Sequence, residues 1–297
     1  MPTVFKSATA QAIFMMVCAS ATIALLWAVL RVASETMHPF YILFWRSVFG
    51  VLILLPIFVR AGPSALKTTR LPLHGVRSLS GIIAMGGIFY SVAHIPLGQA
   101  MAINYSGPLF ATLGAVLILG EPIRSRRMIA LAVGFVGMLI VVRPGVEHVN
   151  LGVLAALIGV VGMAGSLLSI KKLAETEANT TIIFYGNTLG LPISLAVVLA
   201  LGVWQWMSWM EFGLLALIGL MSTVAQLFLN RALKLAEAGA VLPVDFLRLV
   251  FVTVLGAVLF DEQPEVLTWI GAGIILCSTV YIARRESRAP PISESGT

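Results

Sequence analysis

The chain has 297 residues, of which 59% are hydrophobic and only 11% are charged. Soluble domains are about 45–50% apolar and about 25% charged, so this composition excludes an ordinary soluble protein and predicts an integral membrane protein. A net charge of +6 would suit nucleic-acid binding in a soluble protein. Here most Lys and Arg lie between apolar segments, where they suit a surface of anionic lipid, so we expect a bilayer and no nucleic acid as partner.

Ten apolar stretches follow one another along the chain. A helix that crosses the hydrocarbon core needs about 20 mostly apolar residues. Short connections separate the stretches, which cover residues 8–31, 38–60, 75–94, 97–119, 126–143, 150–171, 179–201, 211–231, 238–260 and 265–284. We therefore predict an all-α integral membrane protein of ten transmembrane helices, followed by a disordered cytoplasmic tail over residues 285–297.

The basic residues are distributed unevenly between the two sides of this ten-helix arrangement. Arg31 and Arg143 fall on one side. Fifteen fall on the other: Lys6, Arg60, Lys67, Arg70, Arg77, Arg124, Arg126, Arg127, Lys171, Lys172, Arg231, Lys234, Arg284, Arg285 and Arg288. By the positive-inside rule the side with fifteen is cytoplasmic, so we expect both termini in the cytoplasm and the protein in the cytoplasmic membrane.

An internal repeat relates the two halves of the chain. When the chain is shifted by 141 positions, Glu121 falls on Glu262 and Arg31 falls on Lys172. The repeat predicts one five-helix unit over residues 8–143 and a second over residues 150–284. Because five is odd, the second unit starts from the opposite face, which makes the halves inverted, as in many secondary transporters.

Several segments together resemble the drug/metabolite transporter superfamily, in its EamA-type ten-helix branch. Each half ends with an apolar helix, an acidic turn and a helix rich in small residues. The acidic turns are Gly120-Glu121-Pro122 and Asp261-Glu262. The junction from Tyr90 to Ala100 and Arg46 within the second span also resemble that family. The apolar helices before these turns cover Ala111–Leu119 and Val252–Phe260. The helices rich in small residues after them cover Ile129–Val142 and Ile270–Ala283.

This resemblance implies a carrier that moves a small organic molecule by using gradients. It implies a central cavity lined mainly by the third, fourth, eighth and ninth spans. It favours export, and it leaves open the uptake of a cofactor-like metabolite such as S-adenosylmethionine or riboflavin. Protons are a candidate coupling ion, and a homodimer is left open.

Asp245 and Arg248 are ionisable residues well inside a predicted span. Such groups cost about 2.5–3.5 kcal/mol or more in hydrocarbon, so they face a partner or a cavity. Three positions apart, they share one helix face. They therefore either pair with each other as a structural element or bind a charged substrate and exchange a proton.

Arg46 and its repeat mate Asn187 are two further polar residues within spans. Arg46 is expected to bond neighbouring carbonyls, with substrate binding as the alternative.

Asn104 is the repeat mate of Asp245, and Pro108 has no N–H that could donate a hydrogen bond to the carbonyl of Asn104. Pro192 and Pro243 likewise leave the carbonyls of residues 188 and 239 without a helical donor. Interrupted helices in matching positions of two halves point to a transporter site. Here only the neighbourhood matches, since Pro108 aligns with Leu249 and Pro243 with Ala102, and a simple kink is the alternative.

The remaining candidate site residues divide into two layers. Tyr90, with Arg46 and Asn104, is expected toward the outside, whereas Gln226 and Asn230 are expected with Asp245 toward the cytoplasm. No phosphate-binding loop and no zinc-binding motif occurs in the sequence, so we expect no catalytic residues, no metal and no cofactor. A channel, a membrane-embedded enzyme or a signalling protein is the alternative to a carrier.

Overall fold

The computed structural model describes residues 8–62, 67–120, 125–142, 150–177, 179–235, 244–245, 247–263 and 265–286. Within these ranges the chain is helical apart from short connections and contains no strand. The expected all-α fold is therefore confirmed. Residues 238–243 of the ninth predicted span, including Pro243, and residues 287–297 of the predicted tail lie outside the described residues.

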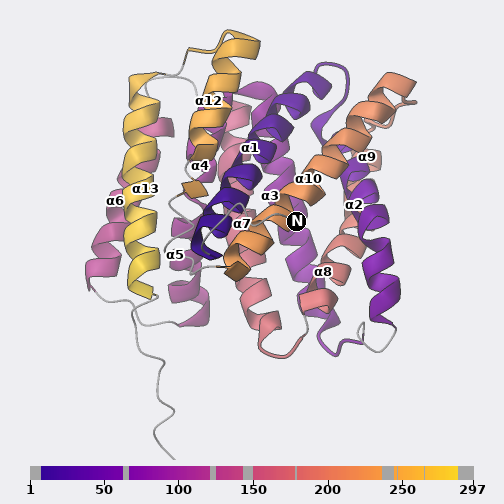
Figure 1. Ribbon diagram of the computed structural model, residues 1–297, viewed down its shortest axis with the longest axis horizontal. Coiled ribbons are helices and arrows are strands. Elements are labelled where there is room, and N and C mark those ends of the chain that lie inside the picture. The colour runs from indigo at the N-terminus through magenta and orange to yellow at the C-terminus, as the bar shows by residue number, and fades with distance from the viewer. Residues whose placement is uncertain are drawn as a thin grey trace, which may run out of the picture.

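The described helices match the predicted spans (Figure 1). Their bounds are α1 Ala8–Ala33, α2 Pro39–Ala61, α3 Leu71–His94, α4 Leu97–Asn104, α5 Gly107–Leu119, α6 Ser125–Val142, α7 Leu151–Ala174, α8 Asn179–Thr188, α9 Gly190–Ala200, α10 Trp209–Leu235, α12 Leu247–Phe260 and α13 Val266–Glu286. Among the described residues, six stretches are long and apolar enough to cross a membrane, and four shorter apolar helices accompany them.

Two of the predicted spans are interrupted near a proline. The fourth consists of α4 and α5, which are separated at Tyr105 and Ser106, and the seventh consists of α8 and α9, separated at Leu189. Pro108 and Pro192 lie in the first turn of the second segment, where a missing N–H costs least. Pro56, by contrast, lies inside the continuous helix α2. A proline is therefore compatible with either outcome.

Alternate connections between the spans meet at opposite ends of the bundle. At one end, which we name the Arg31 end, Gln205 Nε2 donates to Thr36 O over 3.4 Å and Asn150 Nδ2 donates to His94 O over 3.5 Å. At the other, the Glu177 end, Thr68 Oγ1 donates to Glu177 Oε1 over 2.5 Å. This alternation is what a chain that repeatedly crosses the bilayer requires.

Helix packing has the exchange symmetry of an inverted repeat. The 141-residue shift makes α7 the counterpart of α1 and α10 the counterpart of α3. Helices α1 and α10 pack together, and so do their counterparts α7 and α3. The pair α5 and α7 is matched in the same way by α12 and α1. Helices α6 and α13, which correspond to each other, pack side by side (Figure 1). Each half therefore supplies the packing partners that the other half lacks.

Small residues permit the closest of these helix contacts. A Cβ atom added at Gly87 of α3 would collide with the backbone of Gly159 in α7. One added at Gly271 of α13 would lie 2.6 Å from the carbonyl oxygen of Gly137 in α6. Such glycines let membrane helices approach through van der Waals contact, which replaces the hydrophobic effect inside a bilayer. Gly273, also in α13, has open space around it and takes no part in such a contact.

Candidate functional site

Asp245 is the centre of a polar cluster that joins three parts of the fold. Its Oδ1 atom accepts a hydrogen bond from Ser20 Oγ of α1 over 3.1 Å and one from Arg248 NH2 over 2.5 Å. Its backbone oxygen accepts a hydrogen bond from Tyr105 OH over 2.7 Å. Tyr105 lies at the interruption between α4 and α5, so the broken span of the first half contacts the ionisable pair of the second.

The Asp245 cluster is half-buried, and its hydrogen bonding is incomplete. The Arg248 side chain is 13% exposed and that of Asp245 17%. Arg248 Nε and Asn104 Nδ2, beside Tyr105 in sequence, are buried donors without a partner among the described residues. An unsatisfied buried polar group costs about 1–3 kcal/mol. A substrate that supplied acceptors to these donors would recover that free energy.

Arg46 lies apart from this cluster. Its Nε atom donates to Ser222 Oγ of α10 over 3.0 Å, and its guanidinium lies 5.9 Å from the centre of the Phe89 ring in α3. Arg46 thus connects its own helix α2 to α3 and α10. These contacts are with side chains, whereas the sequence suggested neighbouring carbonyls as its partners.

The other predicted site residues are not gathered around Asp245. Asn187 donates to the carbonyl oxygen of Ile183, one turn earlier in α8, over 2.9 Å. The Tyr90 ring stacks on His94 at 4.0 Å between centroids, close to the Arg31 end of α3. Gln226 is exposed on α10. The side chain of Asn230 lies outside the described residues.

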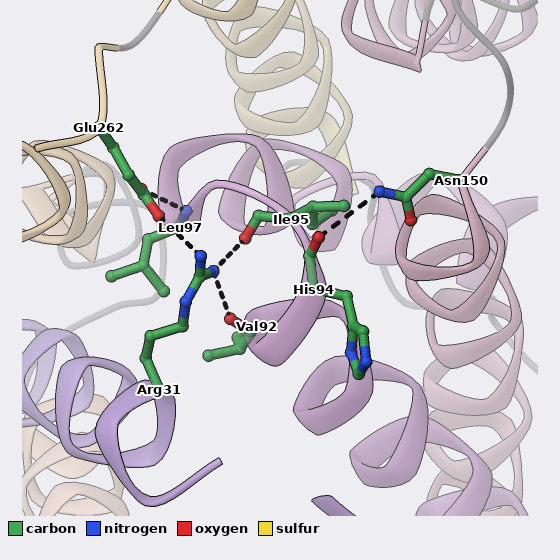
Figure 2. A network of polar contacts seen from close by, with 7 residues as sticks. All are labelled: Arg31, Val92, His94, Ile95, Leu97, Asn150 and Glu262. Atoms are coloured by element: carbon green, nitrogen blue, oxygen red, sulfur yellow. Dashed lines mark hydrogen bonds and ion pairs between the residues drawn. The ribbon is translucent and has the colours of Figure 1, made fainter. Parts of the chain in front are cut away.

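A second polar cluster, which the sequence did not single out as a site, occupies the Arg31 end. Figure 2 shows the Arg31 guanidinium between the end of α3 and the connection from α12 to α13. Arg31 NH1 donates to the carbonyl oxygens of Val92 and Ile95 over 2.8 and 2.6 Å. Arg31 NH2 lies 3.5 Å from Glu262 Oε1, and Leu97 N donates to Glu262 Oε2 over 2.7 Å.

The backbone around Glu262 is shaped to hold this carboxylate. Asp261 has a φ of 52°, in the left-handed region that Asp tolerates better than most residues. Glu262 N then donates back to Gly256 O over 3.1 Å. A Cβ atom at Gly256 would lie 2.6 Å from Glu262 Oε2, so glycine leaves the space that the carboxylate uses. The sequence signals for this cluster were the acidic turn Asp261-Glu262 and the repeat, which aligns Glu262 with Glu121 and Arg31 with Lys172.

Burial raises the pKa of Glu262 from its ordinary value of 4.5, and the Leu97 N–H and the Arg31 charge oppose that shift. Glu262 Oε1 is buried and has no hydrogen-bond partner among the described residues, although it faces Arg31. The carboxylate is therefore held in a place where its charge is only partly compensated.

The Glu177 end has its own polar cluster. The His74 side chain is fully buried in α3, with Nε2 3.7 Å from Glu177 Oε2 and its ring 4.7 Å from the Tyr185 ring of α8. Arg70 NH1 donates to the carbonyl oxygen of Lys172 over 3.0 Å. Polar contacts therefore join the two halves at this end as well. In the described ranges no group of His, Cys, Asp or Glu could hold a metal ion.

Two inverted helical halves with interrupted spans and buried charges between them define a membrane transporter. The chain belongs to the EamA-like transporter family, whose model matches residues 10–143 and again residues 150–284. The expected membership is thereby confirmed, and each of the two matches covers one five-helix half.

Relatives in this family are named as transporters. The chain is 30% identical to an S-adenosylmethionine uptake transporter of Rickettsia prowazekii, over 85% of each chain. It is 29% identical to a riboflavin transporter of Brucella anthropi, over 83% of this chain and 88% of the relative. It is also 29% identical to the pseudopaline exporter CntI of Pseudomonas aeruginosa, over 92% of this chain and 96% of the relative.

A solved crystal structure has the same fold. It superposes with a TM-score of 0.59 at 19% sequence identity, covering 91% of this chain and 98% of that one. At this identity the likeness supports the architecture alone.

Proposed function

We propose that this transporter is a secondary carrier that moves a small organic metabolite across the cytoplasmic membrane by alternating access. Its two halves would rock against each other, so that a site between them faces one side and then the other. The observation that carries this proposal is the exchange of packing partners between the halves. In an arrangement with this symmetry, the two ends can open by equivalent motions.

We further propose that Asp245, Arg248 and Asn104 bind the substrate or a coupling proton. Asp245 lies where α1, the interruption between α4 and α5, and the start of α12 meet. Arg248 Nε and Asn104 Nδ2 offer two donors that the described protein groups do not use. A substrate with a carboxylate or carbonyl group would satisfy them, and the carboxylate of Asp245 could accept from an amine. Arg46 and Asn187, which bond within the protein, would support the helices around the site.

The positive-inside rule orients the carrier. Arg70, Lys171 and Lys172 lie at the Glu177 end, whereas Arg31 is the basic residue of the described part at the opposite end. We therefore propose that the Arg31 end faces the outside and that the Glu177 end and both termini face the cytoplasm. The family includes relatives named for uptake and for export, and a carrier of this kind runs in the direction of the combined gradients.

Transport by purified protein in proteoliposomes tests the proposal. The vesicles are loaded with one compound of a panel that includes S-adenosylmethionine and riboflavin, and entry of the same labelled compound is followed. A carrier exchanges the labelled for the unlabelled compound and saturates, whereas a channel does neither. The same measurement with an imposed proton gradient identifies proton coupling and the preferred direction.

Substitutions test the site within that experiment. Asp245→Asn and Arg248→Ala each remove charge-assisted hydrogen bonds worth about 1.5–3 kcal/mol, so exchange should fall by about tenfold or more. Asp261→Asn is the matched control, because Asp261 is exposed and Asn tolerates its positive φ. Normal exchange by both site variants, with correct folding in detergent, would refute the site.

A further inference from the structure

We infer that Arg31 and Glu262 form the outer gate of the carrier: they join the α12–α13 connection of the second half to the α3–α4 junction of the first. This inference rests on the proposed alternating access and on the proposed orientation. It assigns the outer closure to two residues that lie away from the Asp245 cluster.

The contacts cross the boundary between the halves. Arg31 and the receiving carbonyls of Val92 and Ile95 belong to the first half, whereas Glu262 belongs to the second. Glu262 is also bound by the Leu97 N–H, at the first turn of α4. One carboxylate therefore holds both a side chain and a backbone amide of the opposite half (Figure 2). If the outer ends of the halves separate, these contacts have to break.

Each charged group stands at a helix end that favours its sign. The last carbonyls of α3 lack donors within the helix, and Arg31 supplies one hydrogen bond to Val92 in the last turn and another to Ile95 just beyond it. The first N–H of α4 lacks an acceptor, and Glu262 supplies one. Because α4 begins almost directly after α3, Arg31 and Glu262 together bind both helix ends of a single junction.

Arg31 permits the burial of the Glu262 carboxylate. The Glu262 side chain is only 12% exposed and that of Arg31 is 24% exposed. A buried carboxylate that loses its partner is strongly destabilising, while an uncharged group in its place is not. The closed gate should therefore tolerate loss of both charges better than loss of Arg31 alone.

A cysteine at position 253 would report the state of this end. Thr253 of α12 is 7% exposed. Its Oγ1 atom lies 3.2 Å from where a Cβ atom of Gly98 in α4 would stand, so Thr253 faces the opposite half. In a background with Cys18→Ser and Cys277→Ser, Thr253→Cys should react with a membrane-impermeant maleimide added to intact cells only when the outer ends separate.

The test is a double-mutant cycle in this background. Arg31→Gln should raise the rate of labelling at position 253 by about tenfold, because it leaves a buried carboxylate without a partner. Glu262→Gln alone should label no faster than the parent. Arg31→Gln combined with Glu262→Gln should return labelling toward the parent rate, whereas Arg31→Gln combined with Asp261→Asn should not. Equal labelling of the parent and Arg31→Gln, or no rescue by Glu262→Gln, would overturn the gate.

Two further measurements keep the outcome unambiguous. If Arg31→Gln does not fold, Arg31→Lys serves in its place: it keeps the charge but cannot reach both carbonyls and Glu262, so it should label at an intermediate rate. Labelling does not require transport. Unchanged labelling in a protein that transports would reject the gate alone, and altered labelling in a protein that does not transport would reject the carrier function alone.

Discussion

At the scale of single residues, the carboxylates of Asp245 and Glu262 have different surroundings. Asp245 accepts hydrogen bonds from two side chains through one oxygen atom. Glu262 has one oxygen on a backbone amide and the other facing a guanidinium at 3.5 Å without a hydrogen bond. The first arrangement suits a persistent binding centre, and the second suits a contact that forms and breaks.

The pKa of Glu262 predicts how external pH acts on the gate. Among the described residues the charged group that influences it is Arg31, while Asp261 and Glu265 on its own connection are exposed. Burial raises the pKa in the closed state, whereas an open gate would place the carboxylate in water near its ordinary pKa of 4.5. Protonation therefore stabilises closure, and this stabilisation is complete below 4.5 and lost as pH rises through the raised pKa.

We therefore compare the labelling rate of Thr253→Cys with that of Thr253→Cys combined with Glu262→Gln. The ratio of the first rate to the second should increase as external pH rises. The ratio removes the titration of the cysteine itself, because both proteins carry it. A ratio that does not change between pH 4.5 and 8 would show that Glu262 does not titrate with the gate.

At the scale of elements, two interruptions among the described residues convert long spans into pairs of short helices. The break between α4 and α5 places Tyr105 where its hydroxyl reaches the Asp245 backbone. The break between α8 and α9 lies next to Asn187 in the second repeat, whereas the 141-residue shift places its counterpart in the continuous helix α2 of the first. Inside a bilayer, freed backbone groups need other partners, so breaks of this kind persist only where side chains, water or a ligand supply them.

Replacement of Pro108 tests whether the first break serves transport. Pro108→Ala restores an N–H that can donate to the carbonyl of Asn104, which should favour one continuous helix and reduce transport severalfold. The protein should be at least as stable to heat as the parent. Pro56→Ala is the control, since Pro56 is also exposed but lies within continuous α2. Equal transport losses in the two variants would mean that the break itself has no special role.

At the scale of the whole molecule, the proposed alternating access would require α4 and α12 to separate at the Arg31 end. A Cβ atom at Gly98 would lie 4.0 Å from the Cβ of Thr253, which is within the range of natural disulfides. These positions belong to opposite halves, so a disulfide between them would join the halves at the proposed gate.

Gly98→Cys with Thr253→Cys, in the background without native cysteines, should form this disulfide on mild oxidation. Transport should then stop and should return after treatment with a reducing agent. Each single variant, treated identically, should keep its activity. Full transport by a protein shown to be disulfide-linked would exclude outer opening between α4 and α12.

Much of the architecture could be predicted before the structure. Apolar stretches of spanning length must form helices, because a bilayer provides no partner for an unpaired backbone. Pro108 and Pro192 lie beside the two breaks seen among the described residues, but Pro56 lies in a continuous helix, so a proline alone does not predict a break. The site was less accessible to prediction: Asp245 and Arg248 were recognised as charges in apolar surroundings, but Ser20 and Tyr105, their partners from distant segments, carried no signal that distinguished them from other polar residues in spans.

Sequence by itself determined that this protein is a ten-span helical bundle made of two inverted repeats, since composition, span length and an odd helix count are local or additive properties. Only the tertiary structure decided which charges meet. Arg31 and Glu262 are separated by most of the chain, and nothing in the sequence pairs the one with the other. Their contact depends on how α1, the α3–α4 junction and the α12–α13 connection pack together, a property that no single segment contains.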